Sequence, residues 1–466
     1  MQAPISPVSA FGGGAADTVM HPVVAIAMVG AILCILGLPR KYKIVPFLLA
    51  VFLLPAGQQL YLVGVHLYVP RILILFGLGL VAFAKLRSKK PVLPGGWNDL
   101  DKIFTCWVIM RALAVILLNS ASAPALINQA AFLLDALGGY YFLRFLIRDT
   151  NDIARITKAF AVIVGVLGAT MLYENFRGLN VFGYFGSVPI APAIREGKIR
   201  SQGPFAHSIL AGTFGAIQLA LFIWLISRKR DLVWGVVGII GCTAMVFSSS
   251  SSTPLITYIS VFAGLCFWPL RAKMRTVRWV LLASIVALHL VMKAPVWFLI
   301  ARVDLIAGNS GWDRAMLIDT FIKHFKDWWL IGTNQQATWG FDMGDLCQQF
   351  VNEGEVGGLA TFICFIVLIA RGFAKVGEAR KLLPKNSRDE WLLWLIGVAL
   401  FSNCVAFFGI SYFDQTKFAW YTALSVISVA SLSQTRVLKR REAENDQAES
   451  KQQDNEADLI ASYVSL

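Results

Sequence analysis

Thirteen apolar runs, each about 20 residues long, set the strongest limit on what this chain can fold into. A run of this length crosses the hydrocarbon core of a bilayer as a helix, and backbone groups cannot stay unpaired in lipid. Strands of a membrane β-barrel would be about ten residues long and would alternate in polarity, which these runs do not. The sequence therefore predicts an all-α polytopic bundle of about 12–13 transmembrane spans. The runs lie at residues 22–38, 44–64, 67–85, 101–118, 125–147, 157–174, 204–227, 232–249, 253–270, 279–299, 356–374, 390–410 and 418–434.

The composition excludes a water-soluble protein. Hydrophobic residues make up 57% of the 466 residues and charged residues only 15%, whereas soluble domains carry about 45–50% and about 25%. The seven cysteines form no CxxC pair and have no histidine at metal-ligand spacing. We therefore expect no metal and no cofactor, with the lipid bilayer as the first partner of the chain.

The basic residues predict the orientation of the spans. Clusters of Lys and Arg follow the odd-numbered runs only, and short loops rich in Lys and Arg stay in the cytoplasm. The N-terminus is then expected outside and the C-terminus inside, and the net charge of +14 needs no nucleic-acid partner. The clusters lie at residues 40–43, 85–90, 148–155, 228–230, 271–278, 371–388 and 436–441.

Beyond the membrane bundle, assigned to residues 1–434, residues 435–466 form a tail. It begins basic and turns acidic and rich in glutamine. Such a composition buries little apolar surface, so the tail is expected to be cytoplasmic and disordered.

Two external loops, 175–203 and 301–355, are longer than a simple connection requires. Within the second, residues 312–330 have helix-like apolar spacing and predict an amphipathic helix that ends before Gly332. Both loops carry basic residues although they are expected on the outer side, where the Lys and Arg rule predicts few of them. Arg200 and Arg314 are the candidates for gripping a diphosphate, because a guanidinium matches two phosphate oxygens. Lys198 and Arg302 are expected to support them.

Two motifs resemble the O-antigen ligase and polymerase superfamily. In the first, Arg200 is followed by Gly203, Phe205 and His207 at the entry to a span. In the second, the stretch Asn-Glu-Gly-Glu-Val-Gly-Gly-Leu at residues 352–359 leads into the next span after the large loop. The resemblance covers about residues 195–360 and implies glycosyl transfer at the outer face of the bacterial inner membrane. It also implies a glycan on undecaprenyl diphosphate as donor and a second glycan as acceptor.

One departure from the family pattern favours a polymerase over a ligase. Ligases tend to carry a histidine late in the large loop, where this chain has none between residues 340 and 349. Without it, a carboxylate is expected to act as the general base for the acceptor hydroxyl. Asp345 is the first candidate, followed by Glu353 and Glu355.

Several residues allow two interpretations. His207 either binds sugar or phosphate beside Arg200 or begins the seventh span, and Gly203 either brings the backbone close to a ligand or only shapes a turn. His324 is the only histidine in the second loop. Arg111 and Asp135, expected at similar depth in consecutive spans, predict an ion pair that is either structural or functional.

Three alternative functions remain open. The first is an O-antigen ligase, and the second is a transporter or flippase of lipid-linked oligosaccharides. The flippase is disfavoured because no internal repeat is evident and the polar residues concentrate outside the spans. The third is a scaffold subunit of a polysaccharide export complex. Assembly and export proteins are possible partners in each case.

Overall fold

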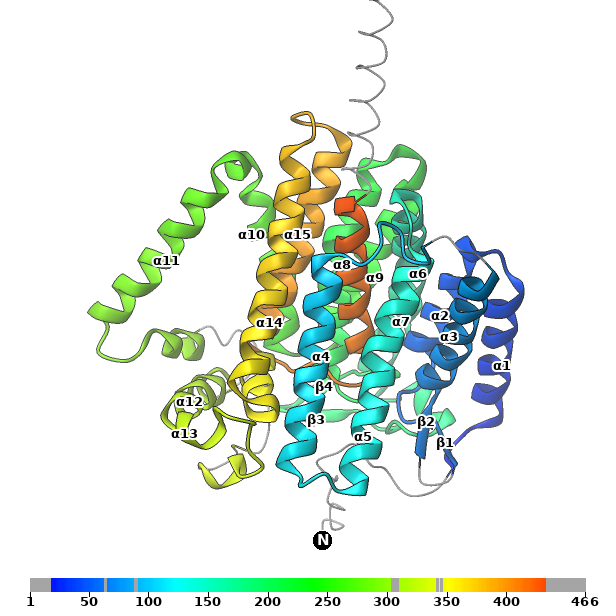
Figure 1. The fold of residues 1–466 in the computed structure, drawn as a ribbon, viewed down its shortest axis with the longest axis horizontal. Coiled ribbons are helices and arrows are strands. Elements are labelled where there is room, and N and C mark those ends of the chain that lie inside the picture. Colours follow the sequence, from blue (N-terminus) through cyan, green and yellow to red (C-terminus); the bar gives the residue numbers. More distant parts are fainter. Residues whose placement is uncertain are drawn as a thin grey trace, which may run out of the picture.

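The computed structural model describes residues 18–62, 65–87, 91–302, 310–340, 343 and 347–432. Over these residues the chain is a bundle of long helices with two short β-hairpins at one end (Figure 1). The predicted all-α helix bundle is confirmed. The expected base Asp345 and the expected tail at 435–466 lie outside the described residues.

A helix overlaps each of the thirteen apolar runs, although the one in the run at 44–64 covers only its first half. Among the described residues, seven helical segments are long and apolar enough to cross a membrane, and α1 and α10 are shorter apolar helices. The run at 125–147 is one helical stretch in three parts, because a π-helical turn widens it around Asp135. The helices are α1 (Pro22–Gly37), α2 (Arg40–Leu53), α3 (Val69–Arg87), α4 (Asp99–Leu118), α5 (Ala123–Leu133), η1 (Leu134–Gly138), α6 (Gly139–Leu146), α7 (Thr150–Arg177), α8 (Ser208–Ser227), α9 (Leu232–Ser248), α10 (Ser252–Cys266), α11 (Met274–Val291), α14 (Gln349–Lys381), α15 (Arg388–Ala406) and a final helix over residues 416–432.

The second predicted span, 44–64, is wrong in its second half. Helix α2 ends at Leu53 with Leu54 as its C-cap, and the next residue, Pro55, has no N–H to donate to a further helical hydrogen bond. The chain then forms an antiparallel hairpin of β1 (Gln59–Leu62) and β2 (Val65–Tyr68), in which Gln59 faces Tyr68. Apolar composition alone did not distinguish this hairpin from the end of a helix.

The two ends of the bundle differ in character. One end, here called the hairpin end, carries β1–β2 and the hairpin of β3 (Ala193–Arg195) and β4 (Lys198–Arg200). The described basic clusters after the odd-numbered spans lie at the opposite end, where Arg271 and Arg380 both reach the carboxylate of Glu390. Within the described residues, successive spans therefore alternate in direction as the charge pattern predicts.

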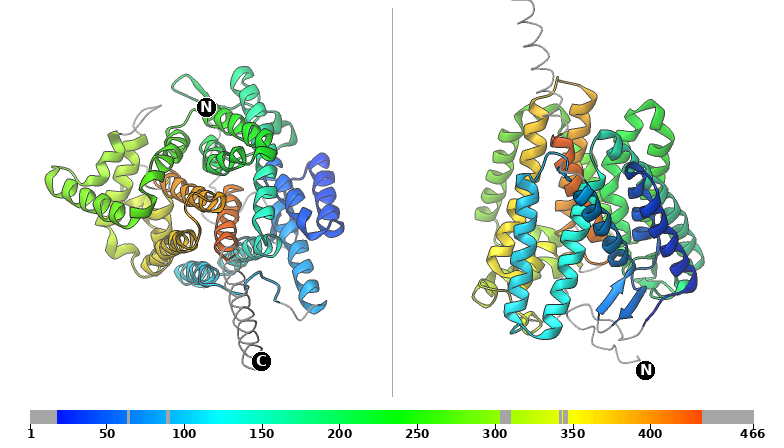
Figure 2. Two further views of the ribbon diagram at one scale, coloured as in Figure 1. Left: turned by 90° about the horizontal axis from the view of Figure 1, so that it is seen from above. Right: turned by 45° about the vertical axis from the view of Figure 1, so that its right-hand side comes forward.

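Helices α15 and 416–432 lie near the middle of the bundle, with the other helices around them (Figure 2, left). Helix α11 lies at the periphery, away from the other spans in Figure 1, and none of its residues is buried. Its side chains are apolar over most of its length, as a lipid-facing helix requires.

Buried ion pairs join the helices. Arg144 on α6 and Asp101 on α4 are both fully buried and form two hydrogen bonds of 2.9 and 3.0 Å. The predicted pair of Arg111 with Asp135 is wrong. Asp135 is held instead by Arg71 at 3.0 Å and Lys417 at 2.6 Å, because α3 and the final helix pack closer to it than α4 does.

The amphipathic helix predicted in the second external loop is confirmed, with one break. It consists of α12 (Ser310–Lys323) and α13 (Phe325–Trp328), which are separated at His324. Phe321 and Trp328 stack at 4.0 Å between ring centroids and form part of a small apolar cluster of their own. Gly332 has a φ of +88° and ends this helical segment where the sequence predicted.

The glycine-rich motif at the start of α14 packs against the end of that segment. Helix α14 kinks at Gly358, whose φ is +71°, and Leu359 donates its N–H to the carbonyl of Trp329 at 2.8 Å. A Cβ at Gly358 would lie 2.6 Å from the carbonyl oxygen of Leu330. The motif therefore lets the backbone of residues 328–331 approach the kink closely.

Candidate functional site

Arg200 is the last residue of β4 and lies at the hairpin end, beside the turn between α9 and α10. Its Nη2 donates to the hydroxyl of Ser251 at 2.7 Å. Ser250 donates to the carbonyl of Ile199 at 2.8 Å, so the serine run fixes both residues at the end of the strand. The Arg200 side chain is only partly exposed, and its Nε has no hydrogen-bond partner within the described residues.

The loop that follows Arg200 is held by a buried carboxylate. Glu174 on α7 is 1% exposed, and its two oxygens accept the backbone N–H groups of Gln202 at 3.0 Å and Gly203 at 2.9 Å. Asn180 donates to the carbonyl of Gly203 at 2.8 Å. Gly203 has a φ of +58°, a conformation that favours glycine, so its evident role is to shape the turn.

Arg314 on α12 reaches the same place from a distant part of the sequence. The pKa of Arg200 lies below its ordinary value because the side chain is buried and because Arg195 and Arg314 carry like charges beside it. The thiol of Cys347 adjoins the same group and acts in the opposite direction. The structure thus brings together the two arginines that the sequence singled out, as a partly buried cluster of positive charge.

The other predicted basic and imidazole groups have different surroundings. Lys198 and Arg302 are exposed, in β4 and at the end of η5 (Val296–Arg302). His207 occupies the N-cap position of α8 without a capping side-chain bond, and its ring lies edge-on to Phe413 at 5.7 Å. His324 contacts the carbonyl of Thr320 at 3.0 Å and stacks on a tryptophan ring, contacts that fit a structural role.

Two of the predicted carboxylates lie in the first turns of α14. Glu353 is fully buried and accepts hydrogen bonds from Trp107 at 2.8 Å and Gln349 at 2.5 Å, while Arg111 lies 3.8 Å away. Glu355 is 1% exposed, and neither of its oxygens has a hydrogen-bond partner within the described residues. Such a buried, unpaired carboxylate is costly for the fold, and Glu355 is the better placed of the two to accept a proton.

A cavity of about 280 Å³ opens near the hairpin end between α4, α14 and the segment that precedes the final helix. This volume lies just below the range of about 300–1,000 Å³ found for ligand pockets. Charged, amide and aromatic side chains share its walls, so it suits a polar ligand with apolar faces. The lining residues are Trp107, Arg111, Phe132, Gln349, Asn352, Phe365, Phe407, Ser411, Tyr412, Phe413, Asp414, Lys417, Trp420 and Tyr421.

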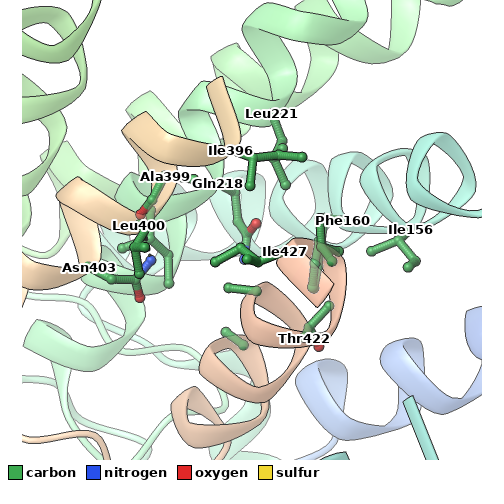
Figure 3. Close-up of a pocket in the computed structure, with 14 residues that line it drawn as sticks. Ile156, Phe160, Gln218, Leu221, Ile396, Ala399, Leu400, Asn403, Thr422 and Ile427 are labelled. Atoms are coloured by element: carbon green, nitrogen blue, oxygen red, sulfur yellow. Dashed lines mark hydrogen bonds between the residues drawn. The ribbon is translucent and has the colours of Figure 1, made fainter. Parts of the chain in front are cut away.

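A second cavity lies inside the bundle between α7, α8, α15 and the final helix (Figure 3). Its volume of about 20 Å³ holds about one water molecule. The polar groups on its walls are the side chains of Gln218, Asn403 and Thr422. It is too small for a sugar or a lipid and plays no part in the site.

Sequence reasoning missed three groups that build the site: Glu174, Ser251 and Asp414. Glu174 carried a detectable signal, because it is an acidic residue at the end of an otherwise apolar span. Ser251 lies in a run of serines, a composition that is also typical of a plain polar connection. Asp414 gave no signal, since its contact with the N–H of Ala206 joins residues 208 positions apart.

Comparisons with known proteins add no assignment. No protein-family model matches this chain, and no curated protein matches it significantly. The functional interpretation therefore depends on the two motifs, on the clustering of Arg200 with Arg314, and on the neighbouring cavity.

Proposed function

We propose that this protein is a membrane glycosyltransferase that polymerises lipid-linked oligosaccharide units at the outer face of the bacterial inner membrane. The donor is a glycan on undecaprenyl diphosphate, and the acceptor is a sugar hydroxyl of another unit. The hairpin end faces outward, and the C-terminus lies in the cytoplasm. The product is exopolysaccharide or O-antigen.

One observation carries this proposal: Arg200 and Arg314, from elements more than a hundred residues apart, belong to segments that border one cavity, through the hydrogen bonds of Ala206 to Asp414 at 2.9 Å and of Gln348 to the Arg314 carbonyl at 3.0 Å. Two guanidinium groups in one partly buried place attract an anion. A diphosphate has the charge and the paired oxygens that two such groups bind.

The chemistry follows from this cluster. The acceptor oxygen forms a bond to the anomeric carbon of the donor, and the bond from that carbon to the diphosphate oxygen breaks. Negative charge then grows on the departing diphosphate, and fixed positive groups stabilise it in the transition state. The candidates from the sequence for accepting the proton of the hydroxyl are Asp345, followed by Glu353 and Glu355. Transfer of this kind requires neither a nucleotide sugar nor ATP.

The main alternative is a flippase of lipid-linked oligosaccharides. Such folds commonly place their sites near the middle of the membrane. Here the arginine cluster and the 280 Å³ cavity both lie toward the hairpin end, which favours chemistry at one face. Transfer to a different acceptor, as in a ligase, would use the same diphosphate site.

The test is the chain length of polysaccharide made by membrane vesicles that hold Arg200→Ala or Arg314→Ala. Both variants should abolish chain growth, while single lipid-linked units accumulate outside. Arg200→Lys should recover only part of the activity, since an ammonium cannot bind two oxygens side by side.

The matched control is Arg177→Ala, which removes an exposed arginine at the hairpin end of α7. It should polymerise normally. Normal chain growth in both Arg200→Ala and Arg314→Ala would refute the proposal. Accumulation of single units on the inner face would instead identify a flippase.

A further inference from the structure

The 280 Å³ cavity offers hydrogen-bonding groups that the protein leaves unused. Arg111 lines it, its nearest acidic atom is Glu353 Oε2 at 3.8 Å, and within the described residues its guanidinium forms no hydrogen bond. The side-chain amide of Asn352 also lines the cavity. Aromatic side chains, among them Trp107 and Trp420, supply flat apolar walls. Flat rings beside amide and charged donors suit a sugar ring, which has apolar faces and hydroxyl edges.

Two junctions connect this cavity to the arginine cluster. At the first, Asp414 Oδ2 accepts the N–H of Ala206 at 2.9 Å, and Phe413 lies against His207. Asp414 and Phe413 line the cavity, whereas Ala206 and His207 belong to the motif that begins with Arg200. A single loop therefore separates the cavity from Arg200.

The second junction leads to Arg314. Gln348 donates to the carbonyl of Arg314 at 3.0 Å. The next residue, Gln349, lines the cavity and accepts the N–H of Tyr412 at 2.6 Å. The cavity thus borders both arginine-bearing segments, from two directions.

Asp414 stands at this border in a strained conformation. Its φ is +50°, in the left-handed region that non-glycine residues rarely adopt. Its Oδ1 accepts the N–H of Thr416 at 3.0 Å at the start of the final helix. Strain of this kind is concentrated at functional sites, because the surrounding structure must hold it in place.

We infer that the cavity is the subsite for the acceptor sugar and that Asp414 is the base that takes the proton of the attacking hydroxyl. This inference rests on the proposed function. The hydroxyl oxygen bonds to the donor's anomeric carbon, and its proton passes to the Asp414 carboxylate. The electron pair of the broken bond leaves with the diphosphate, which the guanidinium groups of Arg200 and Arg314 hold.

The charge state of Asp414 suits this role. Burial raises its pKa to about 6, against the opposing effects of its hydrogen bonds and the charge of Lys417. A base whose pKa lies near the working pH is both deprotonated and able to accept a proton. Within the described part of the chain, the other charged or titratable groups that line the cavity are Arg111 on α4, Lys417 and Tyr421 on the final helix, and Tyr412 just before it. His207, at the start of α8, contacts the lining residue Phe413.

The test uses the full-length protein in liposomes. The donor is the lipid-linked repeat unit extracted from the producing bacterium, and the acceptor is the oligosaccharide released from that lipid. Asp414→Asn should lower the maximal transfer rate at least about 100-fold, with donor binding unchanged. Asn352→Ala should raise the acceptor concentration at half-maximal rate about 2- to 13-fold, the range for one lost hydrogen bond.

The pH dependence of transfer shows whether Asp414 acts as a base or only accepts hydrogen bonds at the start of the final helix. Transfer by the unchanged protein should fall as pH drops below about 6, following the raised pKa of Asp414, whereas the residual rate of Asp414→Asn should not follow this step. Histidines also titrate near neutral pH, so His207→Gln must leave the midpoint in place.

The outcomes distinguish this inference from the proposed function. If Arg200→Ala abolishes transfer while Asp414→Asn and Asn352→Ala leave the rate and the acceptor dependence unchanged, the acceptor subsite is refuted and the glycosyltransferase stands. If Arg200→Ala also transfers normally, both fail. If Asp414→Asn does not fold, an unchanged acceptor dependence in Asn352→Ala still overturns the inference.

Discussion

Glu174→Gln tests how the loop after Arg200 is held. The carboxylate of Glu174 is 1% exposed and accepts two backbone N–H groups, at 3.0 and 2.9 Å. Glutamine has one side-chain oxygen, so its amide nitrogen would face a second donor. An N–H left buried and unpaired costs about 1–3 kcal/mol. If the transition state, in which Arg200 binds the diphosphate, is destabilised by this amount, the rate falls about 5- to 150-fold.

The assay is chain extension in liposomes, together with thermal unfolding of the purified protein in detergent. Both the rate and the unfolding temperature should fall, and the affinity for the lipid-linked donor should weaken. Glu378→Gln, an exposed glutamate on α14, is the matched control and should change neither quantity. A Glu174→Gln protein with normal rate and normal unfolding temperature would refute the view that this carboxylate positions the loop.

Three further changes test the fold around the site. Arg144→Met should lower the free energy of unfolding by about 3–5 kcal/mol, because it leaves the buried Asp101 without its charge partner; adding Asp101→Asn should recover much of the loss in thermal unfolding. Gly358→Ala should loosen the 310–340 segment, since its Cβ would meet a carbonyl oxygen at 2.6 Å, and unchanged resistance to limited proteolysis would contradict this. The raised pKa of Asp414, about 6, means that its contribution to stability is full below about pH 4 and lost as pH rises through 6. Relative to Asp414→Asn, the free energy of unfolding of the unchanged protein should therefore fall by about 3 kcal/mol as pH rises from 4 to above 6. Parallel curves of unfolding free energy against pH for the two proteins would contradict this.

Much of the architecture was predictable because it depends on local properties. The apolar runs located the helices, and the spacing of Lys and Arg predicted their alternating direction. The motif residues Arg200 and Arg314 were chosen because they did not fit that charge pattern. The error at residues 44–64 arose because an apolar strand pair and an apolar helix end have the same composition, and only Pro55 marked the break.

The partners of charged residues could not be predicted in the same way. Asp135 was expected to pair with Arg111, which lies at a similar depth along the preceding helix in the chain. It meets Arg71 and Lys417 instead, because the neighbours of a helix depend on how all the spans pack. Glu353, a candidate base by its motif, is enclosed by Trp107 and Gln349 for the same reason.

The sequence by itself determined the helical class, the order of the spans and the two arginines, because hydropathy and charge are properties of short segments. Only the tertiary structure decided that these arginines lie in one cluster, that Glu174 accepts hydrogen bonds from the loop after Arg200, and that Asp414 lines a cavity. These contacts join residues as far as 208 positions apart. No local propensity encodes such distances, since they result from the packing of helices whose contacts are set by side-chain shape along their whole length.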